Sequence, residues 1–183
     1  MPKHPAIAEQ ELVRQCKRGH LKYQELLYKQ FYGYAMGIGL RYSANRDDAL
    51  EAVNDVFIKV FNSIKSFDEK LPFKPWLRRV IVNTVIDQRR KNIKNLAEAG
   101  LDEAAFAATP ALVVSKLNAD DIVMLMQTLP EMNRMVFNLY EVDGYNHEEI
   151  SLMLGIAASS SRVYLGRAKE RLRKLILQQE EKR

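Results

Sequence analysis

Apolar residues recur at intervals of three and four along nearly the whole chain, and this spacing is typical of α-helices. Residues 46–64 give the clearest example, because their apolar positions would form one broad stripe along a helix. No segment alternates apolar and polar residues as a half-buried β-strand would. The sequence therefore predicts an all-α protein, and its 183 residues suffice for two small domains.

The first predicted domain covers residues 7–92 and contains about four helices. Gly19 is expected to separate a short first helix from the second. Pro72 and Pro75 indicate a loop followed by a new helix, because proline is tolerated only in a first helical turn. The next residues, 93–119, have weak periodicity and many alanines, which indicates a flexible linker.

The second predicted domain, residues 120–178, carries the signals of a helix-turn-helix. Gly144 is a suitable residue to end one helix. Asn146 and Glu149 then have the spacing of a capping box, which marks the start of the next helix. Gly155 lies in the following turn, before a long final helix.

The final helix follows a run of small residues in the segment GIAASSSRVYLGRAKERLRK, residues 155–174, which contains six basic residues and one acidic residue. The small residues would let the start of the helix approach a DNA phosphate, while longer side chains reach base edges in the major groove. Helical spacing turns positions 161, 165, 168, 172 and 175 inward. The predicted DNA contacts are Ser160, Arg162, Val163, Tyr164, Arg167, Lys169 and Arg171. A solvated basic surface helix is the alternative interpretation.

The distribution of charge favours DNA reading over that alternative. Residues 121–153 carry one basic and six acidic residues, whereas residues 154–183 carry eight basic and three acidic residues. The switch from acidic to basic coincides with the predicted turn, so the basic residues are concentrated on the last helix.

Other classes of protein find little support. No run of about 18 apolar residues predicts insertion in a membrane, no signal peptide is recognisable, and Cys16 is the only cysteine. The three histidines lack metal-binding spacing, and no phosphate-binding loop or nucleophile motif occurs. We therefore expect a cytoplasmic protein that is not an enzyme and needs no metal or cofactor.

Two sets of motifs resemble the extracytoplasmic-function group of the sigma-70 family. The C-terminal set resembles the group's promoter-binding domain and comprises Leu129-Pro130-Glu131, Gly144, Glu148-Glu149-Ile150, Leu154-Gly155 and Arg167-Ala168-Lys169. The N-terminal set lies in RDDALEAVNDVFIKVF and FKPWLRRVIVNTVIDQRRK, through Phe73, Trp76, Leu77, Asn83, Asp87 and Arg90. Both sets occur in the family's order, and the resemblance covers nearly the whole chain.

The resemblance implies a sigma factor that binds core RNA polymerase and directs promoter recognition, DNA melting and transcription initiation. One helix would dock on the clamp helices of the polymerase's largest subunit through Asp48, Glu51, Asn54, Asp55 and Ile58. The last helix would read the minus-thirty-five element. The minus-ten element, as a separated strand, would contact Phe67, Lys70, Phe73, Lys74, Trp76, Arg78, Arg79 and Asn83. Aromatic groups beside positive charge suit unstacked bases, although for Trp76 a mainly core position is favoured over a stacking one.

Two positions depart from the family pattern. Ser161 stands where an apolar residue is usual, which could loosen the seat of the last helix, and Tyr164 replaces a frequent basic residue. Partners expected from the resemblance are core RNA polymerase, promoter DNA and a separate anti-sigma factor, with a monomer when free. The alternatives are a helix-turn-helix regulator acting without polymerase docking and an all-helical adaptor.

Overall fold

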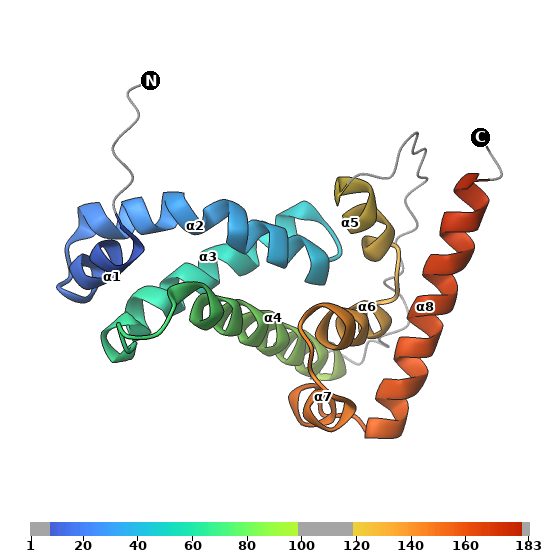
Figure 1. The fold of residues 1–183 in the computed structure, drawn as a ribbon. Helices are drawn as coiled ribbons and strands as arrows, with labels where there is room; N and C mark the ends of the chain where they lie inside the picture. The colour runs from blue at the N-terminus through green and yellow to red at the C-terminus, as the bar shows by residue number, and fades with distance from the viewer. Residues whose placement is uncertain (1–7, 99–118, 181–183) are drawn as a thin grey trace. The chain divides into compact units, whose positions relative to one another are not determined.

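The computed structural model describes residues 8–98 and 119–180, and every regular element within these ranges is helical (Figure 1). This confirms the all-α prediction. None of the helices in these ranges is long and apolar enough to cross a membrane. The elements are α1 (Glu9–Lys17), α2 (Leu21–Tyr42), α3 (Arg46–Ser63), the 3₁₀ turn η1 (Ile64–Ser66), α4 (Phe73–Glu98), α5 (Ala119–Gln127), α6 (Glu131–Phe137), the π-helical η3 (Asn138–Val142), α7 (His147–Leu154) and α8 (Ala158–Glu180).

Local signals in the sequence set several helix ends. Gly19 separates α1 from α2 and has φ of 84°, in the left-handed region that favours glycine. Gly155 ends α7 with φ of 67°, and its N–H donates to the Ser151 carbonyl over 2.9 Å. Both glycines therefore have the role that their position in the sequence predicted.

The described residues fall into two compact units. The first lies within Met1–Gly39 and Leu50–Val85, and the second within Leu40–Ala49 and Ile86–Arg183. Helix α4 extends to Glu98, so residues 93–98, expected to start the linker, are helical. Residues 99–118 of the predicted linker lie outside the described residues, and its last residue, Ala119, begins α5.

An aromatic cluster forms one end of the core of the first unit. The ring of Phe73, at the start of α4, lies 5.0 Å from the ring of Phe31 on α2 and 5.7 Å from that of Phe67. Trp76, one turn further along α4, lies 5.0 Å from Phe67 and is half-buried. Because these rings pack on α2, they fix the start of α4 and the loop that precedes it.

The core of the second unit forms where α6, α7 and α8 pack together (Figure 1). Leu139, Ile150 and Ala168 come from three different elements and have no exposed surface. Burial of these apolar side chains is the main force that holds α8 against the rest of the unit.

Arg134 on α6 is a buried charge in the second unit, with 4% of its surface exposed. Its guanidinium donates to the carbonyls of Tyr42, Gln127 and Leu129 over 3.1–3.3 Å. Asn138 donates to the Arg41 carbonyl over 2.8 Å. Carbonyls at the end of a helix have no partner within that helix. Arg134 and Asn138 therefore supply hydrogen-bond donors to the last carbonyls of α2.

Candidate nucleic-acid interface

Helix α8 has the predicted inward face. Ser161, Leu165 and Ala168 are buried, and Leu172 and Leu175 are half-buried. The predicted DNA contacts lie outside this stripe: Arg162, Val163, Arg167, Lys169 and Arg171 are exposed, and Ser160 and Tyr164 are half-buried. The burial pattern therefore confirms the inward face, and it leaves the basic side chains outside that face accessible.

Hydrogen bonds fix the turn that presents α8. The Asn146 side chain accepts from the Glu149 N–H, and the Glu149 carboxylate accepts from the Asn146 N–H, each over 2.8 Å. This confirms the predicted capping box at the start of α7. The Ser151 hydroxyl donates to the Ile156 carbonyl over 2.6 Å, which links the end of α7 to the turn.

Ser161 has a polar partner inside the unit. Its side chain is completely buried, and its Oγ lies 2.9 Å from Nδ1 of His147 on α7. The loosening of α8 was expected because an apolar residue is usual at this position in the family. The structure supplies a hydrogen bond there, so the residue links α8 to α7.

Acidic side chains of the same unit pair with two of the predicted DNA-binding cations. Arg162 lies 2.9 Å from Glu148 on α7, and Lys169 lies 2.6 Å from Glu141 on η3. All four side chains are substantially exposed, so these ion pairs are weak and open to exchange. A phosphate could therefore replace either carboxylate.

The loop before α4 and the first turns of α4 form a second basic surface. Lys70, Lys74, Arg79 and Asn83 are exposed there, while Trp76 and Arg78 are half-buried. Phe67 and Phe73 are only 4% and 1% exposed. The prediction that these two rings receive bases does not fit this packing, since both already pack against other rings within the core.

The predicted polymerase-binding residues follow one side of α3. Glu51, Asn54 and Ile58 are exposed, and Ile58 exposes 59% of its surface although it is apolar. Asp48 is exposed and accepts a hydrogen bond from the side chain of Asn45 over 2.9 Å, at the start of the helix. Asp55 is half-buried and has a partner within the chain.

Contacts made by α1 were not foreseen from the sequence. Its side chains bind the loop before α4 at three points, through Glu9, Arg14 and Lys17. The acidic and basic spacing within α1 indicates only an amphipathic helix, so no local signal could have revealed its partner. Among residues 8–98 and 119–180, no cluster of three or more His, Cys, Asp or Glu is arranged to hold a metal ion.

Two family models match the chain. The model for Sigma-70 region 2 matches residues 27–94, and the model for Sigma-70, region 4 matches residues 119–172. The two matches together cover well over half of the chain, in the order in which the motifs were found.

Similar proteins cover the chain almost from end to end. The ECF RNA polymerase sigma-E factor of Haemophilus influenzae is 27% identical over 176 residues, covering 90% of this chain and 93% of the relative. The protein of the same name from Escherichia coli K12 is 26% identical over 177 residues, covering 90% and 92%.

A solved structure shares the fold. The sigma factor RpoE from Bartonella quintana, solved in complex with the anti-sigma factor NepR, is similar with a TM-score of 0.52 and 22% identity. The match covers 83% of this chain and 95% of the other. With two sigma-70 regions matched and sigma-E factors similar over nearly its full length, the chain belongs to the extracytoplasmic-function group of the sigma-70 family.

Proposed function

We propose that this sigma factor directs promoter recognition through three surfaces: one on α3 for core RNA polymerase, one at the start of α4 for the minus-ten element, and one on α8 for the minus-thirty-five element. The observation that carries the proposal is the division of α8 into a buried stripe and an exposed basic flank. A helix-turn-helix needs such a division to hold its second helix while presenting it to duplex DNA.

The residues proposed to act at the minus-thirty-five element divide into two groups. Arg162, Val163 and Tyr164 lie near the start of α8, where side chains of a recognition helix reach base edges. Arg167, Lys169 and Arg171 lie further along and would contact phosphates. Base contacts give sequence preference and phosphate contacts give salt-dependent affinity.

The surface at the start of α4 is proposed to take the separated strand of the minus-ten element. Lys70, Lys74, Arg78, Arg79 and Asn83 supply charge and hydrogen bonds. Phe67 and Phe73 act here as support for the loop, because they are buried, while the half-buried Trp76 retains an accessible part of its ring. Unstacked bases bind where accessible rings and positive charge adjoin.

The proposed polymerase surface on α3 combines exposed apolar and polar side chains. Ile58 would be a central apolar contact, flanked by Glu51 and Asn54, with Asp48 nearer the start of the helix and the half-buried Asp55 as a lesser contributor. An exposed isoleucine within a polar stripe has the composition expected of a docking surface. Core RNA polymerase is the proposed partner.

An anti-sigma factor is a further proposed partner. The solved relative from Bartonella quintana is described in complex with such a factor. The proposal for this chain rests on its membership of the same family and on the likeness of fold.

A reconstituted transcription assay tests the proposal. Purified core polymerase alone should start nonspecifically, and addition of the protein should give transcripts from defined promoters. Promoter binding without directed initiation would favour a helix-turn-helix regulator. Promoter affinity that does not fall as salt rises would favour an adaptor, because phosphate contacts make DNA binding strongly dependent on salt.

A further inference from the structure

Helix α1 contacts both ends and the middle of the loop before α4. Lys17 Nζ donates to the Phe67 carbonyl over 2.9 Å, at the start of the loop. Glu9 Oε1 accepts from the Phe73 N–H over 3.1 Å, at its end. Glu9 and Lys17 are eight residues apart and so about 12 Å apart along the helix axis, a span that lets one short helix hold both ends.

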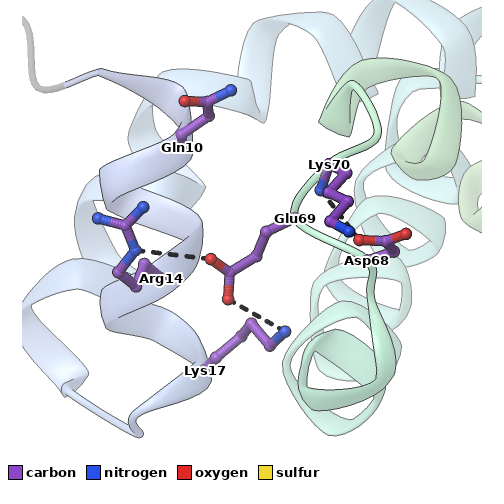
Figure 2. A pocket seen from close by; sticks show the side chains of 6 residues that line it. All are labelled: Gln10, Arg14, Lys17, Asp68, Glu69 and Lys70. Carbon is purple, nitrogen blue, oxygen red and sulfur yellow. Dashed lines mark hydrogen bonds and ion pairs between the residues drawn. The ribbon is translucent and has the colours of Figure 1, made fainter.

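Glu69 attaches the middle of the loop to α1. Its carboxylate lies 3.1 Å from Lys17 Nζ and 3.5 Å from Arg14 Nε, both on α1 (Figure 2). The hydrogen bond from Lys17 is the largest cause that lowers the pKa of Glu69 below its ordinary value. The carboxylate is therefore ionised at neutral pH, and the attachment would be lost only in acid.

The loop between these attachments is folded by its own hydrogen bonds. The Asp68 side chain accepts from the Lys70 N–H and the Asp68 carbonyl accepts from the Leu71 N–H, each over 3.0 Å. Lys70 and Leu71 are both exposed, and Leu71 exposes 59% of its surface. Both side chains are therefore accessible to an incoming strand.

We propose that Lys17, Arg14 and Glu69 are positioning residues that hold this loop in its DNA-binding form before DNA arrives. The inference rests on the proposed role of the loop at the minus-ten element. Ordering a loop on binding lowers affinity, because conformational freedom is lost at that moment. A loop already held by α1 avoids that loss.

The contacts of Glu69 with α1 should affect the order of the loop more than the stability of the fold. The side chains of Glu69, Lys17 and Arg14 expose 35%, 24% and 49% of their surface, so the ion pairs contribute little to the unfolding free energy. The buried rings of Phe67 and Phe73 anchor the ends of the loop independently. Removal of the Glu69 charge should therefore loosen residues 68–71 in a folded protein.

Glu69→Gln in the full chain tests the inference, and Glu25→Gln is a matched control. Glu25 pairs with Lys29 on the exposed side of α2 in the same unit, and its pKa is also lowered mainly by its lysine partner. In each variant the glutamate of a glutamate–lysine pair loses its negative charge. Only the pair of Glu69 and Lys17 involves the loop.

Three measurements separate loop order from stability and from polymerase docking. For Glu69→Gln we expect faster hydrogen exchange at the Lys70 and Leu71 amides and an unchanged unfolding midpoint. With core polymerase, binding should be unchanged, while open-complex formation on promoter DNA should fall about two- to fivefold, the range of an exposed ion pair. Glu69→Asp, which keeps the charge, should recover part of the loss, and Glu25→Gln should match the parent protein.

Faster exchange with unchanged open-complex formation would overturn the inference while leaving the proposed function intact. Unchanged exchange at both amides would overturn it as well, because the ion pairs would then not hold the loop. Failure of the parent protein to direct initiation would instead refute the proposed function.

Discussion

His147 Nδ1 lies 2.9 Å from Ser161 Oγ, joining the first turn of α7 to the buried face of α8. The His147 ring also stacks on Tyr140, with ring centroids 4.5 Å apart. Helix α8 is thus tied by a polar contact where the family pattern has an apolar residue. This contact explains how a serine is accommodated in the interior of a helix-turn-helix.

Replacing Ser161 with alanine should destabilise the second unit. The change removes the partly buried hydrogen bond between Ser161 and His147, and a typical hydrogen bond of this kind contributes about 0.5–1.5 kcal/mol. Urea unfolding of the full chain measures the difference. Ser159→Ala, at an exposed position of the same helix, is the control and should have little effect.

Replacing Glu148 with glutamine should strengthen DNA binding. Glu148 pairs with Arg162 over 2.9 Å, and its negative charge would also lie near the DNA phosphates in the proposed complex. We expect affinity to rise about two- to fivefold, the worth of an exposed pair. Titration of a labelled promoter duplex gives the affinity, and weaker binding would contradict the proposed orientation of α8.

Arg162 and Arg171 should contact different parts of the DNA, a base edge and a phosphate respectively. Arg162→Ala should cost about 1–3 kcal/mol of DNA affinity and relax preference at one upstream promoter position. Arg171→Ala should weaken binding to all sequences alike and reduce the salt slope by about one unit. Binding to single-base promoter variants at several salt concentrations distinguishes them. Identical profiles would mean that the two residues contact the same kind of group.

Replacing Ile58 with lysine should weaken binding to core RNA polymerase. The side chain is 59% exposed, so the change should leave the fold intact. Loss of a central apolar contact is expected to reduce affinity about tenfold, which corresponds to roughly 1.4 kcal/mol. Leu21→Lys alters a side chain that is 78% exposed on α2 and serves as the control. Equal affinities in a pull-down would remove Ile58 from the proposed surface.

Cys16 should resist modification in the folded protein. The thiol is 1% exposed, and burial raises its pKa to about 11. The raised pKa means that the folded protein favours the neutral form of the thiol. The stability that this thiol contributes is therefore fully present at pH values below the ordinary thiol pKa, and it is lost as the pH rises toward 11. A thiol reagent at pH 8 should react slowly with native protein and rapidly in denaturant. Fast reaction in both would show that α1 opens readily.

Local features of the sequence determined the helical class, several helix ends and the inward face of α8. Gly19 and Gly155 ended helices, and Asn146 capped one, because these effects depend on neighbours within about four residues. The stripe of Ser161, Leu165 and Ala168 followed directly from the helical period.

Tertiary structure alone decided which polar and aromatic side chains meet. Lys17 bonds the Phe67 carbonyl 50 residues away, and Arg134 bonds the Tyr42 carbonyl 92 residues away. Spacing along the chain carries no information on such partners. The same holds for Phe67, whose ring the sequence places beside positive charge but which the fold buries against Phe73. Packing resolves that choice, because burying a large ring gains more free energy than leaving it exposed to water.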